Sequence, residues 1–177
     1  ADLKNADLQE ADLSEGILIE ACLENCNLSE ADLCGTDISG ANLKNARLHR
    51  TVLYRCRGKE VDFSNAVLTQ ANLVEANLSG ANFTHANLME SNIEGANLTN
   101  ACFKDANLSE VNLTGVFLAN ANLSGANFTN SECIAADLVG CDSTGANLHN
   151  TYLNHADLSG ANLKSALNLT CDQVETA

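Results

Sequence analysis

Hydrophobic residues recur along this chain at every fifth position. When residues 1–165 are divided into blocks of five beginning at Ala1, the third residue is Leu, Ile or Phe in 30 of the 33 blocks. The first residue is Ala in 21 blocks, and the second is Asp or Asn in 23. The fourth and fifth residues vary, and many are turn-forming pairs such as Ser79-Gly80. The pattern therefore repeats across almost the whole chain without an insertion or a deletion.

A period of five fits neither regular secondary structure. It advances about 140° around an α-helix at each repeat, and in a β-strand it changes face at each repeat. The chain must therefore change direction once in each block. Within a block, the first and third residues lie on one side of a short extended segment and the second lies on the other. Each block thus predicts a strand stub with an outward second residue, followed by a corner at the fourth and fifth residues.

Two consecutive blocks, residues 71–75 and 76–80, read Ala-Asn-Leu-Val-Glu and Ala-Asn-Leu-Ser-Gly. Both follow the pattern A-(D/N)-L-x-x, through which residues 1–165 resemble the pentapeptide-repeat family. The resemblance implies an all-β fold, a right-handed quadrilateral β-helix with four blocks in each coil, although the periodicity alone does not fix the number four. Residues 1–165 would then form about eight coils, spaced by roughly 4.8 Å.

The chain is expected to form one domain in two parts. Residues 1–165 form the predicted pentapeptide-repeat β-helix, and residues 166–177 form a C-terminal cap with a short helix. The cap begins where Asn168 breaks the repeat. Thr170 is the expected N-cap of the helix, and Gln173 is its expected capping-box partner.

The charge is strongly negative and unevenly distributed. The formal net charge is −14. Residues 1–32 contain nine acids and one base, whereas residues 44–59 contain six of the nine basic residues and no acid. The acidic surface disfavours nucleic acid and anionic membranes and favours basic protein partners. The chain has no apolar run long enough to cross a membrane.

Residues 44–59, which we call the basic belt, interrupt both the charge and the repeat. Gly58 stands where the pattern expects Leu. In one interpretation the belt is a partner-contact surface, whose arginine forks and tyrosine bind carboxylates or a phosphate. In the other it is a diverged coil that bulges at Gly58 and neutralises acidic neighbours. The candidate contact residues are Arg47, Arg50, Tyr54, Arg55 and Arg57.

Three phenylalanines, Phe63, Phe83 and Phe103, occupy third positions twenty residues apart. With four blocks in each coil, they would lie above one another in successive coils. Because the third position faces inward, we interpret them as an interior ladder of stacked rings and not as a binding site for an aromatic cofactor.

The eight cysteines do not indicate a disulfide or a metal site. Cys26, Cys56 and Cys141 occupy first positions and Cys133 a third position, where a thiol is a small apolar filler. No C-x₂-C pair or clustered Cys/His set occurs, so neither a metal nor another cofactor is predicted. Unpaired thiols favour a reducing compartment such as the cytoplasm. The periplasm stays open, because a pattern in register from Ala1 resembles a cut or processed end.

Two functional hypotheses follow. The leading one is a non-enzymatic, rigid, acidic scaffold that presents flat faces to an unknown protein partner, because flat faces without loops offer no place for catalytic residues. It would act as a monomer or as a dimer joined at a rod end. The alternative comes from the resemblance: some members of the family mimic duplex DNA, bind DNA gyrase and confer quinolone or toxin resistance. The short C-terminal helix, the basic belt and the absence of projecting loops count against that alternative.

Overall fold

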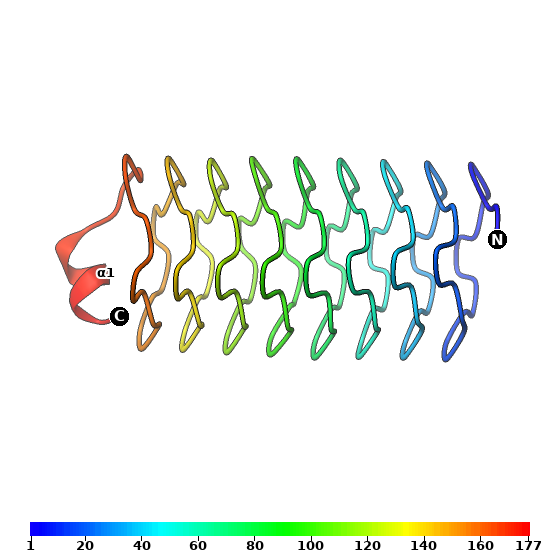
Figure 1. Cartoon of the computed structure of the whole chain (residues 1–177), viewed down its shortest axis with the longest axis horizontal. Helices are drawn as coiled ribbons and strands as arrows, with labels where there is room; N and C mark the ends of the chain where they lie inside the picture. Colours follow the sequence, from blue (N-terminus) through cyan, green and yellow to red (C-terminus); the bar gives the residue numbers. More distant parts are fainter.

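The computed structural model of the 177 residues shows a rod of stacked coils, with the N-terminus at one end and the single helix, α1, at the other (Figure 1). Every parallel β-bridge joins the second residue of a block to the residue twenty positions later, from Asp2–Cys22 to Asn147–Leu167. Four blocks therefore make one coil. The strand stubs are single bridges, and α1 (Cys171–Glu175) is the only helix. The quadrilateral β-helix that the resemblance implied is thereby confirmed.

The four sides of the rod each contain every fourth block. Face 1 contains the blocks that begin at residues 1, 21, 41 and so on. In the same way, face 2 begins with the block at residue 6, face 3 with the block at residue 11 and face 4 with the block at residue 16, and each continues at every twentieth residue. Residues at the same position of neighbouring blocks on a face therefore lie one coil apart, at a spacing of roughly 4.8 Å.

Backbone hydrogen bonds hold the coils together and close the corners. The Leu73 N–H donates to the Asn92 carbonyl of the next coil at 2.7 Å, and the Ala76 N–H donates across the corner to the Leu73 carbonyl at 3.1 Å. The second residue also has a local role, because the Asn72 Oδ1 accepts the Val74 N–H at 3.1 Å. This bond explains why Asp and Asn prevail at the second position: their short side chains accept hydrogen bonds from turn N–H groups.

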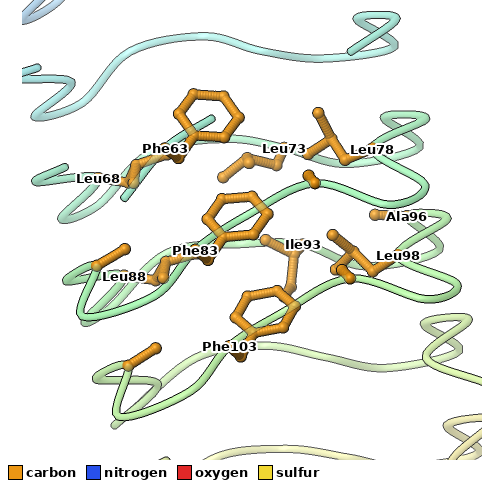
Figure 2. Close-up of a cluster of buried hydrophobic side chains, with 14 of the residues drawn as sticks. Phe63, Leu68, Leu73, Leu78, Phe83, Leu88, Ile93, Ala96, Leu98 and Phe103 are labelled. Carbon is orange, nitrogen blue, oxygen red and sulfur yellow. The ribbon is translucent and has the colours of Figure 1, made fainter. Parts of the chain in front are cut away.

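The first and third positions form one continuous core from Ala21 to Ala156. The predicted interior ladder lies at its centre, where the Phe63, Phe83 and Phe103 rings stack on one another (Figure 2). The ring centroids are 4.9 Å and 4.6 Å apart, with interplanar angles of 14° and 3°. Such close, nearly parallel rings add to the stabilisation that burial of the same apolar area provides.

The coil does not bulge at Gly58, contrary to the expectation for a diverged coil. Arg57 keeps its bridges to Asp37 and Asn77, and the Gly58 N–H donates to the Asn77 carbonyl at 2.8 Å. The missing side chain is replaced from both neighbouring coils, because atoms of Leu78 and Ile38 lie 2.6 Å and 3.0 Å from the place where a Cβ would stand. Side chains of the two neighbouring coils thus fill the space at Gly58, and the backbone keeps its regular hydrogen bonds.

The β-bridges continue to Leu167, two residues beyond residue 165, before α1 folds over the end of the rod. The capping box forms as the sequence predicted, since Thr170 accepts the Gln173 N–H and the Gln173 side chain accepts the Thr170 N–H. The Gln173 Nε2 also donates to the carbonyls of Leu148 and Thr151, at 2.9 Å and 2.8 Å. These bonds attach the helix to the last coils. At five residues, α1 is far too short to cross a membrane.

Candidate interaction surface

The basic belt is a ring around one coil and not a patch on one face. Its charges are directed to several sides of the rod, so no flat ligand contacts all of them together. The structure brings together only neighbouring members, such as Tyr54 and Arg55. Arg47 lies on face 2 and Arg57 on face 4. The corners that follow faces 1, 2, 3 and 4 carry, in that order, Lys44, Arg50, Arg55 and Lys59.

Two of the arginines pair with carboxylates on the neighbouring coils. The Arg55 Nε lies 2.6 Å from the Glu75 Oε2, and its guanidinium lies 4.8 Å from the centre of the Tyr54 ring. The hydrogen bond with Glu75 raises the pKa of Arg55 further above its ordinary value. The Arg57 Nε lies 3.2 Å from an Asp37 oxygen. These pairs are exposed to solvent, so they contribute little to stability.

The remaining basic residues of the belt differ in their hydrogen-bond and ion-pair partners. The Arg50 Nε donates to the Gln70 Oε1 at 2.8 Å, and the Gln70 Nε2 donates in turn to Glu90 at 2.7 Å. Lys59 reaches Glu60 at 3.8 Å. Lys44 and Arg47 are exposed and form no ion pair. Among the four arginines of the five candidate contact residues, Arg47 and Arg50 form no ion pair, and Arg47 also forms no side-chain hydrogen bond.

Asp37 shows how the second position holds a carboxylate in its ionised form. Its pKa is lowered from the ordinary value, first by the hydrogen bond from the Ser39 hydroxyl, then by the Ser39 backbone, and to a smaller extent by Arg57. Similar bonds lower the pKa of the carboxyl groups of Asp12, Asp142 and Asp157. Hydrogen bonds within the turn thus favour the charged form of these four carboxylates.

The net charge is distributed unequally over the four faces. Face 1 and the corner that follows it carry five acids and four bases, so this side is nearly neutral. The opposite side, face 3 with its corner, carries six acids and one base. Faces 2 and 4 each carry five acids and two bases. The rod therefore has a more acidic side and a nearly neutral side, which the sequence analysis did not identify.

Two exposed aromatic side chains were also missed. Phe117 is 51% exposed on face 4, and Tyr152 is 56% exposed on face 3. Both occupy the second position of a block, which the pattern directs outward and fills with Asp or Asn in 23 of 33 blocks. The position alone was therefore enough to identify them as unusual surface residues.

The cysteines lie as their positions predicted: Cys26, Cys56, Cys133 and Cys141 are buried. Burial raises the pKa of Cys26 and Cys141 to about 11 and that of Cys56 and Cys133 to about 12. These thiols stay protonated at neutral pH and pack as apolar groups, because the thiolate is the reactive form.

Comparison with known proteins gives one family. A scan against protein-family models matches the family of pentapeptide repeats, in eight copies, over residues 1–30, 26–57, 66–105, 106–142 and 144–170. A search of curated proteins found no match.

Several solved structures are similar to this chain. HetL, a pentapeptide repeat protein involved in heterocyst differentiation regulation in the cyanobacterium Nostoc sp. strain PCC 7120, is 33% identical, with 94% of this chain and 80% of HetL covered and a TM-score of 0.47. QnrB1, a plasmid-mediated fluoroquinolone resistance protein, is 22% identical over 91% and 88% of the two chains, with a TM-score of 0.40. A pentapeptide repeat protein of the Arabidopsis thaliana thylakoid lumen is 30% identical over 59% and 69%, with a TM-score of 0.36. None of these similarities by itself assigns a partner to this chain.

Proposed function

Because the chain belongs to the pentapeptide-repeat family, whose match extends over most of its length, we propose that it is a non-enzymatic scaffold whose flat faces bind a protein partner. The observation that carries this proposal is the continuous core from Ala21 to Ala156. Each coil is packed against the next, so the outward side chains are held in a fixed lattice with a coil spacing of roughly 4.8 Å. A preorganised surface loses little conformational entropy on binding and therefore suits protein recognition.

The charge of the faces supports a basic partner. Faces 2, 3 and 4 all carry an excess of carboxylates, which attract a positively charged surface and steer its approach. On this acidic surface, the basic belt is a local region of positive charge that can contact an acidic group of the partner. Arg47 is the best placed belt residue, because it is exposed on face 2 and forms no ion pair. We propose that it pairs with a carboxylate of the partner, with Arg50 beside it.

The test is chemical crosslinking and affinity purification with the chain as bait, in wild-type form and as the variants Arg47→Glu and Lys104→Glu. Both substitutions reverse one exposed charge that has no carboxylate partner, and Lys104 lies on face 1, away from the proposed contact. Changes at Arg55 and Arg57 are avoided, because they would leave Glu75 and Asp37 without their arginines.

We expect a specific protein to be retained by the wild type and by Lys104→Glu, and to be retained about tenfold less by Arg47→Glu. Equal retention by all three baits would show that the basic belt is not a contact. If the wild type enriches no protein over an unrelated acidic bait, the scaffold proposal itself is wrong.

The second candidate function is mimicry of duplex DNA toward DNA gyrase. It is favoured by the stacked carboxylates at the fifth positions of face 2, where Glu10 lies one coil from Glu30 and Glu90 one coil from Glu110. Arg50 and Gln70 separate the two pairs, so the row of charge is not continuous.

A supercoiling assay with purified gyrase tests whether the chain mimics DNA. Inhibition that disappears when Glu90 and Glu110 are both changed to Gln would support mimicry, and an unchanged rate at micromolar protein would exclude it.

A further inference from the structure

Phe117 is an apolar side chain on an otherwise polar column. Its bridge partners on face 4 are Asn97 in the preceding coil and Asp137 in the next. The ring is 51% exposed, whereas the other four phenylalanines are buried. Aromatic residues, phenylalanine included, are enriched at protein interfaces relative to the rest of the surface. The exposure of Phe117 therefore requires a reason other than packing.

The surroundings of Phe117 are partly apolar and accessible. Ala119 and Val139, in the fourth positions of its own block and of the block one coil further, are half-buried on the same face. A shallow hollow lies beside the ring, toward the corner with face 3. It is lined by Glu75, Ala76, Asn77, Gly95, Asn97, Thr99 and Phe117. Gly95 presents no side chain to this hollow, so a partner backbone can approach closely.

The charges near Phe117 all have one sign. Asp137 lies one coil away in the same column and Asp157 two coils away. Faces 3 and 4 contain no Lys or Arg after Lys59. The ring is therefore exposed in a negative field with no cation of this chain beside it.

Elsewhere in this rod, an exposed aromatic ring and a carboxylate bind an arginine of the chain itself. At the basic belt, the Arg55 guanidinium lies over the Tyr54 ring at 4.8 Å and donates to Glu75, which comes from the next coil. An aromatic ring and a carboxylate from adjacent coils thus hold one arginine between them. Phe117 and Asp137 are likewise a ring and a carboxylate from adjacent coils, but no arginine of this chain is available to them.

We propose that Phe117 and Asp137 form a docking site for a basic segment of a partner protein, which places an arginine over the Phe117 ring and against the Asp137 carboxylate. A cation over an aromatic ring and a charge-assisted hydrogen bond are both stronger where the partner excludes water. Ala119 and Val139 then support the apolar stem of the same side chain. The proposal rests on the scaffold function above and names the chemistry of one contact on it.

The experiment uses the full chain, labelled with fluorinated phenylalanine, and a nine-residue oligo-arginine peptide as the probe. The five phenylalanines give five fluorine resonances, and assignment by the Phe117→Asn variant identifies the exposed one. We expect the Phe117 resonance to shift on titration with the peptide at about 50 mM salt while the four buried resonances stay in place. Binding constants are measured in parallel by fluorescence anisotropy of the labelled peptide.

Two pairs of matched variants separate a specific site from general attraction. Phe117→Asn restores the prevalent residue of the second position, and we expect it to weaken peptide binding about three- to tenfold. Val67→Asn removes an exposed apolar residue from the same position on face 2 and is expected to leave binding unchanged. Asp137→Asn should weaken binding more than Asp157→Asn, although each removes one charge from the same column.

Several results would overturn the proposal. A stationary Phe117 resonance, equal effects of Asp137→Asn and Asp157→Asn, or no binding of the peptide would each show that the site does not hold an arginine. Self-association of the chain that Phe117→Asn abolishes would identify a second copy as the occupant instead. The scaffold function fails separately, when the wild-type bait enriches no protein.

Discussion

At the scale of single residues, the fifth position of the block carries the main conformational cost of this fold. The backbone there has a positive φ in all 33 blocks. Gly and Asn accept this left-handed conformation easily, but eight glutamates also adopt it. The hydrogen bonds on both sides of the corner impose the conformation, since the Glu75 N–H, for example, donates to the Glu94 carbonyl at 3.0 Å. The fold therefore contains local strain that glycine would relieve.

Ala135 provides a clean test of this cost. It is exposed at a fifth position with φ of 53°, so Ala135→Gly relieves the strain of a side chain on a left-handed residue. We expect the free energy of unfolding to rise by about 0.5–1 kcal/mol, as measured by urea denaturation. The control is Ala119→Gly at a fourth position, where φ is not positive and the added chain flexibility should lower the free energy of unfolding by about 0.5–1 kcal/mol. Changes of the same sign in both variants would contradict the explanation.

At the scale of one coil, the interior ladder shows how third positions on a face depend on one another. The Phe83 ring lies between two partners at 4.9 Å and 4.6 Å, and it is fully buried. A change at Phe83 therefore affects the packing of three successive coils at once.

We predict that Phe83→Ala lowers the free energy of unfolding by about 3–5 kcal/mol, because it creates a cavity and removes both stacking contacts. Phe83→Leu restores the residue found at most third positions and should cost less than about half as much. Equilibrium denaturation followed by circular dichroism measures both values. Because both variants lose the stacked ring, equal stability would show that the cavity left by alanine costs nothing in this core.

The helix α1 is the element that the sequence predicted in most detail. The spacing of Thr170 and Gln173 was sufficient to predict the capping box, because that motif is local and needs no knowledge of the rest of the fold. The two bonds from Gln173 to Leu148 and Thr151 could not be predicted in the same way. They depend on where the chain turns back over the last coil, and this is a property of the stacked rod.

At the scale of the whole molecule, the same division between local and long-range information holds. The five-residue period alone predicted which side chains form the core, since Leu73 and Ala76 are inward in any regular stacking of blocks. Pairs such as Arg55 and Glu75 required the number of blocks in a coil, which only the family resemblance supplied. The filling of the Gly58 position by Ile38 and Leu78 depends on side-chain conformations in three coils, and no sequence pattern encodes them.

The charge of the whole rod leads to a prediction about salt. The chain carries a net charge of −14, and where carboxylates occupy adjacent coils of one face, as Glu10 and Glu30 do, they lie one coil apart, at roughly 4.8 Å. Only four pairs join a Lys or Arg to a carboxylate, and their side chains are all at least partly exposed. Repulsion between like charges therefore outweighs the attraction within pairs when the solution contains little salt.

Added sodium chloride should consequently stabilise the rod. Raising the ionic strength from about 10 mM to about 150 mM shortens the screening length from about 30 Å to about 8 Å, and we expect the free energy of unfolding to rise by on the order of 1 kcal/mol. The double variant Lys44→Glu, Arg47→Glu lowers the net charge by four further units without breaking an ion pair, so its stability should depend on salt more steeply. Thermal unfolding at a series of salt concentrations measures both slopes. A stability that falls with added salt would show that the attraction within the few ion pairs exceeds the repulsion along the faces.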